Sequence, residues 1–328
     1  MVSSCRALTP ACHLNLLNRE ELGTMPRQNK ARVLVTGATG MQGGAAVQAL
    51  LREGHHVTAF VRDPSSGAAR ALAAQGVALA AGNMDDTASL DAAGVGHDVV
   101  FSMQMPALDD AGTEERQARN IVAAARRAGV AQIIHTSVSA TGWRARHPDI
   151  YPGVPKTYWD GKEGAEDAVR HGGLDAWTIF KPAFYMENFI PPKALWMFPG
   201  LAHGELLTAA SPQTPLALIA ADDFGAAVAA AVADPKKFHG AEIELAGDAP
   251  TFSEIAAVLS KAARRDITAV FLKAEELDGR IHEGMAASQV WLDHVGYPAR
   301  PHHAAHYGLS TTTLQQWAER QDWHTTGS

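Results

Sequence analysis

The segment Val33-Leu34-Val35-Thr36-Gly37-Ala38-Thr39-Gly40-Met41-Gln42-Gly43 decides the fold, because it joins an apolar β-branched run to three regularly spaced glycines. Residues 33–36 predict a strand, and the Ala- and Leu-rich residues 43–52 predict a helix. Between them, Gly37 permits a tight turn, Gly40 lets a phosphate approach the backbone, and Gly43 lets helix and strand pack closely. The segment therefore predicts a pyrophosphate site at a helix N-terminus, as in dinucleotide-binding folds.

The same alternation of apolar runs and helical stretches continues along the chain and predicts a parallel sheet with helices on both faces. The predicted strands are residues 33–36, 57–61, 77–80, 99–102, 133–136, 176–180 and 243–246. The predicted helices between them are residues 43–52, 68–74, 114–128, 163–170 and 225–232. Right-handed crossovers then give an α/β fold with a doubly wound parallel Rossmann sheet.

Two regions depart from this alternation and predict a small α/β substrate lobe at the C-terminal end. Residues 186–215 are rich in Pro and aromatic side chains and predict a loop lid or a hairpin. Thr251-Phe252-Ser253-Glu254 is a capping box, and it introduces a predicted helix, strand and helix over residues 254–263, 267–272 and 275–285. The predicted division is a disordered extension (1–30), a dinucleotide-binding Rossmann domain (31–185), and a lid plus C-terminal lobe (186–328), within which residues 218–250 return to the sheet.

Composition excludes several classes of protein. The extension lacks a sustained apolar period, and Met25 is an alternative start. It holds both cysteines, Cys5 and Cys12, so we expect no disulfide framework, no Cys-x-x-Cys metal site and a reducing cytoplasm. A net charge of −7 argues against a nucleic-acid surface, and the short apolar runs argue against a membrane span. We expect a small-molecule substrate and allow for a homodimer.

Signatures along the chain resemble the NmrA-like family of atypical short-chain dehydrogenases/reductases. Besides Thr36-Gly37-Ala38-Thr39-Gly40, they are Val61-Arg62-Asp63-Pro64, Gly82-Asn83-Met84-Asp85-Asp86, Asp160-Gly161-Lys162, Lys181-Pro182-Ala183-Phe184-Tyr185-Met186-Glu187-Asn188-Phe189 and Asp223-Phe224-Gly225. Asn83 stands where that family usually has Asp, and Lys181 where it usually has Arg. The resemblance covers about residues 32–272. It implies a Rossmann fold that holds NADP or NAD, in a reductase or in a redox-sensing regulator.

The end of the second predicted strand favours NADP(H) over NAD(H). Arg62 is the first charge there, and a guanidinium suits a ribose 2'-phosphate, whereas an acid would hold a free 2'-hydroxyl. Asp63 follows, but Pro64 suggests that it starts a turn. The remaining expected cofactor contacts are Gly37, Thr39, Gly40, Met41, Gln42, Gly43, Asn83, Met84, Gln104, Lys162, Pro182, Phe184 and Tyr185. Phe184 and Tyr185 have an alternative role as core aromatics.

Tyr158 and Lys162 form a Tyr-x-x-x-Lys pair, which lies on one helical face. In short-chain dehydrogenases such a lysine lowers the pKa of the tyrosine and binds the nicotinamide ribose, and the phenol exchanges a proton with the substrate oxygen. Near a helix start, the dipole and the ammonium are both expected to favour phenolate. Ser137 or Ser139 would polarise the same oxygen. The alternative is that Lys162 serves the cofactor while Tyr158 has no catalytic role.

Two further motifs are given structural roles. Asp223 is expected to be the N-cap of the Ala-rich helix that follows it. His302, His303 and His306 are expected to lie in a solvated loop and not in a metal site, because they follow two prolines and have no acids nearby.

We therefore expect an NADP(H)-dependent oxidoreductase for a small, fairly apolar carbonyl, alcohol, quinone or enone. The lid offers Phe189, Trp196, Met197 and Phe198 and few charges. The main alternative is a non-catalytic redox sensor that binds a protein partner. A nucleotide-sugar epimerase would need a polar pocket that the lid sequence does not supply.

Overall fold

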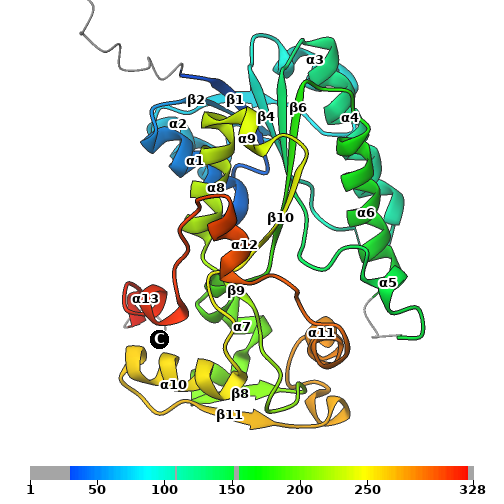
Figure 1. Ribbon diagram of the computed structural model, residues 1–328. Helices are drawn as coiled ribbons and strands as arrows, with labels where there is room; N and C mark the ends of the chain where they lie inside the picture. The colour runs from blue at the N-terminus through cyan, green and yellow to red at the C-terminus, as the bar shows by residue number, and fades with distance from the viewer. Residues whose placement is uncertain (1–29, 108, 151–154, 324–328) are drawn as a thin grey trace, which may run out of the picture.

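The computed structural model describes residues 30–107, 109–150 and 155–323, and it contains a seven-stranded parallel sheet (Figure 1). The strands are β1 (Arg32–Thr36), β2 (His56–Val61), β3 (Ala78–Ala81), β4 (Val99–Ser102), β5 (Gln132–Thr136), β6 (Ala176–Pro182) and β10 (Ala241–Leu245). Their order is β10-β6-β5-β4-β1-β2-β3, so the winding direction reverses between β1 and β4, where open sheets of this kind bind ligands. The predicted doubly wound sheet is confirmed.

Helices cover both faces of the sheet (Figure 1). One face carries α1 (Met41–Arg52), α2 (Gly67–Ala74), α8 (Ala221–Ala233) and α9 (Pro235–Phe238). The other carries α3 (Thr87–Gly94), α4 (Ala111–Arg127) and α6 (Lys156–Arg170). The sequence did not predict α3. Helix α6 begins seven residues earlier than predicted, at Lys156 instead of 163, so Tyr158 and Lys162 both lie within its first half.

Helices α1 and α8 touch backbone to backbone. A Cβ atom built on Gly225 would lie 2.4 Å from the carbonyl oxygen of Ala45. The prediction that Asp223 caps α8 is wrong, because α8 begins at Ala221 and Asp223 lies inside its first turn. The Asp223 carboxylate instead accepts hydrogen bonds from the backbone N–H and the hydroxyl of Thr312, at 2.6 and 2.9 Å. A tertiary contact has taken the place of the local cap.

Most of the remaining elements gather at one end of the sheet, whereas the helix over Pro301–His306 packs beside β10 (Figure 1). They are β7 (Phe184–Tyr185), η1 (Met186–Phe189), α7 (Ala194–Met197), η2 (Pro199–His203), β8 (Glu205–Thr208), β9 (Leu218–Ile219), α10 (Phe252–Ala263), β11 (Thr268–Phe271), η3 (Ala274–Leu277), α11 (Glu283–His294), α12 (Pro301–His306), α13 (Leu314–Ala318) and α5 (Trp143–Arg146). Below, "the lobe" means residues 186–215 and 251–297. Strands β8 and β11 pair in parallel within it, so residues 186–215 form short helices and a strand and not a hairpin.

Three sequence predictions about this region can be judged. The capping box is confirmed, since Thr251 and Glu254 bond each other's backbone N–H groups. The helix predicted over residues 275–285 is wrong: Gly279, at φ +69°, lies between η3 and α11. The histidine stretch is not a loop but helix α12, which Pro301 starts at its first position.

Several expectations concern residues that the structure leaves undescribed. The predicted extension over residues 1–30, with Cys5, Cys12 and Met25, lies outside the described residues except for Lys30, whose ammonium donates to the carbonyl of Glu53. Among the helices of the described residues, none combines the length and the apolar character needed to cross a bilayer.

The α1–α8 contact generates a stability prediction. Gly225→Ala is expected to lower the free energy of unfolding by about 1–3 kcal/mol, because the added methyl group meets backbone and not a movable side chain. Gly67→Ala is the matched control: nothing lies within 4 Å of its Cβ position, so stability should stay level or rise by up to about 1 kcal/mol. Urea denaturation of both variants measures this, and equal stabilities would contradict the close contact.

Candidate functional site

The turn after β1 depends on glycine at two positions. Gly37 has φ +66°, in the left-handed region that favours glycine, and its carbonyl accepts the N–H of Gly40 at 2.9 Å. A Cβ atom on Gly43 would lie 2.2 Å from that same carbonyl oxygen. Helix α1 can therefore begin this close to β1 only with glycine at residue 43.

The N-terminus of α1 is left without a side-chain cap. Gly40 occupies the N-cap position in an extended conformation, and the first turn holds no acidic residue. The N–H groups of a helix's first turn have no partner within the helix and require one from outside. Such an end suits a pyrophosphate, so the residues present fit the dinucleotide that the sequence predicts.

At the end of β2, the acidic Asp63 and the positively charged Arg62 have different roles. The Asp63 carboxylate accepts hydrogen bonds from the N–H and the hydroxyl of Ser65, at 2.8 and 2.6 Å, which confirms that Asp63 starts a turn. Arg62 is exposed, and its guanidinium makes no hydrogen bond or ion pair within the described residues. Beyond β3, the side chain of Asn83 accepts the N–H of Asp85 and so stabilises a turn.

A cavity of about 740 Å³ opens where the carboxyl ends of the strands meet the lobe. Predicted site residues that line it are Gly40, Met41, Gln42, Gln104, Ser137, Tyr158, Lys162, Pro182, Phe184 and Tyr185. Predicted residues outside its lining are Gly37, Thr39, Gly43, Arg62, Asn83 and Met84. The structure thus brings the proposed catalytic residues together with the N-terminus of α1, while Arg62, Asn83 and Met84 follow the neighbouring strands β2 and β3 outside the cavity lining.

The lobe supplies cavity residues that the sequence analysis missed. They include Lys193, Gln289, Trp291 and Tyr297. Trp291 packs against Trp159, with ring centroids 5.3 Å apart, and against Tyr297 at 5.1 Å. The apolar spacing of residues 285–292 indicates this face of α11, which begins at Glu283 and so lies further along the chain than the helix predicted over residues 275–285.

Lys162 is held by a buried acid from another helix. Its ammonium lies 2.5 Å from Glu114 of α4, and the two side chains are 8% and 2% exposed. Burial raises the pKa of Glu114, and the nearby Lys162 opposes that shift. Glu114 was not among the expected site residues. Because the partners are 48 residues apart, no local motif indicates the pair.

The expected stabilisation of a Tyr158 phenolate is wrong. Burial raises the pKa of Tyr158, and the nearby Tyr297 and Glu114 raise it further. The Lys162 ammonium lies 5.8 Å from the centroid of the Tyr158 ring, while Glu114 offsets its charge. Tyr158 is therefore a protonated phenol, able to donate a hydrogen bond.

Ser137 is already engaged with a buried carboxylate. Its hydroxyl donates to Glu166 of α6 at 2.5 Å, and both residues are buried. Ser137 still lines the cavity, and a hydroxyl oxygen that donates its hydrogen can also accept a hydrogen bond. Gln104 also lines the cavity; its amide nitrogen donates to the hydroxyl of Ser102 at 2.9 Å.

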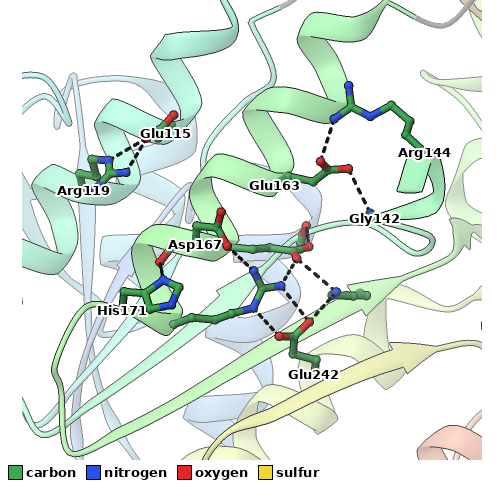
Figure 2. Close-up of polar contacts among 12 residues, drawn as sticks. Glu115, Arg119, Gly142, Arg144, Glu163, Asp167, His171 and Glu242 are labelled. Carbon is green, nitrogen blue, oxygen red and sulfur yellow. Dashed lines mark hydrogen bonds and ion pairs between the residues drawn. The ribbon is translucent and has the colours of Figure 1, made fainter. Parts of the chain in front are cut away.

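Glu166 belongs to a charge network that joins α6 to strands β6 and β10. Lys181 lies 3.1 Å from Glu166 and 2.6 Å from Glu242, and Arg170 pairs with Glu166, Asp167 and Glu242. Figure 2 shows the carboxylates of Asp167 and Glu242 joined by dashed lines to the same guanidinium group, that of Arg170. Lys181, which departs from the usual Arg, thus forms two ion pairs here.

A second set of contacts fixes the loop after β5 on the same helix. Arg144 pairs with Asp160 and Glu163, at 2.6 and 2.7 Å, and Glu163 also accepts the backbone N–H of Gly142 (Figure 2). Helix α6 is therefore restrained on both sides of Lys162.

The network generates a prediction about acid stability. Hydrogen bonding to Arg170, assisted by Lys181, lowers the pKa of Glu242 from 4.5 to about 2. A lowered folded-state pKa contributes stability that is present above the unfolded value and is lost as the pH falls through the folded value. Glu242→Gln is therefore expected to be less stable than the wild type at pH 7, and the difference should shrink between pH 4.5 and about 2.

Urea denaturation at pH 7 and pH 3 measures that difference. Glu275→Gln is the control, because Glu275 is exposed and makes no ion pair within the described part of the chain. A stability difference for Glu242→Gln that is the same at both pH values would contradict the prediction.

Comparison with known proteins gives one family over most of the chain. The model of the NmrA-like family matches residues 29–318. Quinone oxidoreductase 2 of Escherichia coli strain K12 is 29% identical over 240 residues, which cover 72% of this chain and 76% of that protein. The NAD(P)H azoreductase of Xenophilus azovorans is 30% identical over 250 residues, covering 74% and 78%.

Solved structures show the same fold. The Escherichia coli NADPH-dependent quinone oxidoreductase, complexed with NADPH, matches with a TM-score of 0.69 at 27% identity, over 87% of this chain and 98% of that one. NmrA, a negative transcriptional regulator in complex with NADP, matches with a TM-score of 0.71 at 22% identity, over 90% and 99%. The second likeness shows the fold alone.

Proposed function

The chain belongs to the NmrA-like family, and from that membership we propose that it is an NADP(H)-dependent oxidoreductase for a small, flat and fairly apolar quinone, enone or carbonyl. One observation carries the choice of acceptor. A single cavity is lined both by Met41 at the N-terminus of α1 and by the aromatic rings of the lobe.

The relatives support the reductase class. Two of them are named as a quinone oxidoreductase and an azoreductase, and each aligns over more than two thirds of this chain. The chain is accordingly an NAD(P)-dependent reductase that uses NADP. We propose, in addition, which acceptor it reduces and what individual residues contribute.

The residues that would bind the cofactor come from the glycine turn before α1, from the end of β2 and from helix α6. The backbone N–H groups at the start of α1 would hold the pyrophosphate, Arg62 the 2'-phosphate, and Lys162 the nicotinamide ribose. When bound, NADPH supplies a hydride, so the acceptor gains two electrons and one hydrogen and still needs one proton. The Glu114 carboxylate keeps the Lys162 ammonium in place for its contact.

Tyr158 is the proposed source of that proton. It lines the cavity as a neutral phenol, which can hydrogen-bond an acceptor oxygen and release its proton as negative charge develops there. Ser137, whose hydroxyl hydrogen is committed to Glu166, cannot donate to the same oxygen without breaking that bond.

The acceptor's shape follows from the cavity walls. Trp159, Trp291, Tyr297, Phe184 and Phe198 supply flat apolar surfaces, and none of the described residues lining the cavity is Asp or Glu. Aromatic side chains of this kind favour planar aromatic ligands through stacked or edge contacts. A quinone satisfies these conditions and also carries the oxygen that Tyr158 requires.

Arg62 provides a test of cofactor preference. Arg62→Ala is expected to raise the Kd for NADPH by about 10- to 100-fold, because one charge-assisted hydrogen bond to phosphate is lost, and to leave NADH binding unchanged. Isothermal titration calorimetry with both cofactors measures this. Arg146→Ala, at another exposed arginine, is the control, and equal wild-type affinities for NADPH and NADH would contradict the assignment.

Tyr158 provides a test of the chemistry. Tyr158→Phe is expected to lower turnover by about 100-fold or more while NADPH affinity stays within error, the usual effect of removing a general acid. Steady-state NADPH oxidation with quinones and enones measures turnover, and fluorescence titration measures binding. Lys162→Ala is the comparison, expected to reduce both.

Two outcomes would change these assignments. Unchanged turnover in Tyr158→Phe would remove Tyr158 from the mechanism and leave water as the proton source. A wild type that binds NADPH and reduces none of the acceptors would instead favour the non-catalytic redox sensor.

A further inference from the structure

A lysine of the lobe reaches the helix end at which the pyrophosphate is proposed to bind. Lys193 lies between η1 and α7 and lines the cavity. Its Nζ is 3.3 Å from the Sδ atom of Met41, the first residue of α1, which directly follows Gly40. The lobe therefore places a cation beside the glycine turn of the Rossmann sheet.

The charge of Lys193 has no acid partner within the described residues. Its neighbours are the Met41 thioether, a weak acceptor, and the side-chain oxygen of Asn188 at 3.2 Å. The nearby Glu187 carboxylate instead accepts the backbone N–H of Ala221 and the indole N–H of Trp317. Burial lowers the pKa of Lys193, and Glu187 opposes this only in part.

The two lysines that line the cavity differ in this respect. Lys162 is neutralised by Glu114 at 2.5 Å, whereas Lys193 is not neutralised. The N-terminus of α1 adds a partial positive charge at the same place, because its first-turn N–H groups have no side-chain cap. Two positive groups that face one space call for an anion between them.

We propose that Lys193 binds the pyrophosphate of the dinucleotide, so that the lobe contributes a cofactor contact; this rests on the proposed function. The 2'-phosphate is the less suitable partner, since Arg62 at the end of β2 is outside the cavity lining. Lys193 is followed in α7 by Trp196 and Met197, which also line the cavity. A contact between Lys193 and the cofactor would thereby connect the cofactor to α7, whose residues line the acceptor site.

The test compares cofactors that share the pyrophosphate but differ in the 2'-phosphate. Lys193→Met keeps an unbranched side chain of nearly the same length and removes its charge, and it is expected to raise the Kd for NADPH and for NADH alike, by about 10-fold or more. Lys193→Arg is expected to stay within a few-fold of the wild type. Lys236→Met, at an exposed lysine on α9, should change nothing. Adenosine 2',5'-bisphosphate lacks the pyrophosphate bridge, so Lys193→Met should raise its Kd by a smaller factor than the Kd for NADPH.

Thermal melting separates binding from folding. The melting temperature of cofactor-free Lys193→Met should be unchanged or higher, because a partly buried charge without an acid partner is removed, while the increase caused by NADPH should become smaller. If Lys193→Met does not fold, Lys193→Gln takes its place in the same measurements.

Two results would overturn the proposal. Unchanged Kd values for both cofactors would exclude a pyrophosphate contact. If the Kd values are unchanged and Lys193→Met raises the KM for a naphthoquinone sulfonate but not for the uncharged naphthoquinone, Lys193 would instead bind an anionic acceptor. A loss of NADPH affinity alone would assign it to the 2'-phosphate. Failure of the wild type to reduce any acceptor would contradict the enzyme proposal and leave these binding comparisons intact.

Discussion

Seven strands run parallel, and this constraint brings the carboxyl ends of β1, β4, β5 and β6 to one edge of the sheet. Helices must cover both faces of such a sheet, so its carboxyl edge is the place left for a ligand. The contact between Gly43 and the Gly37 carbonyl sets how close α1 comes to β1. Both the uncapped helix end and the position of the lobe over the cavity depend on that arrangement.

The ion pairs of α6 connect the parallel sheet to the residues of the candidate site. Lys162 and Glu166 face different partners, with Glu114 on α4 for the first and Lys181 and Arg170 for the second. Removing one member of a buried pair leaves an uncompensated charge, which costs about 3–5 kcal/mol, so the pairs strongly favour one arrangement of α4, α6 and β6. The lysine that we propose for the cofactor is therefore held in place by a buried acid from a neighbouring helix.

The lobe and the Rossmann sheet share one wall of the cavity through aromatic contact. Trp159 of α6, the neighbour of Tyr158, packs against both Trp143 and Trp291, with ring centroids 5.8 and 5.3 Å away, and these two rings also contact each other at 6.2 Å. Such ring pairs add stabilisation beyond the area they bury. The docking of the lobe depends on these side chains, and the acceptor selectivity that we propose depends on Trp159 and Trp291 among them.

The sequence by itself determined the glycine turn, the seven strands, the doubly wound sheet and the Tyr-x-x-x-Lys spacing of Tyr158 and Lys162, because these depend on local periodicity and on residues a few positions apart. The structure extended the predicted helix over residues 163–170 back to Lys156, so that both residues lie on it. Only the tertiary structure decided that Glu114 neutralises Lys162, that Asp223 binds Thr312 instead of capping α8, and that Lys193 reaches Met41. Those partners lie 48 to 152 residues apart, and burial, which raises the pKa of Tyr158, is set by the packed lobe. Short-range patterns specify elements, whereas charge partners and solvent exclusion are properties of the assembled molecule.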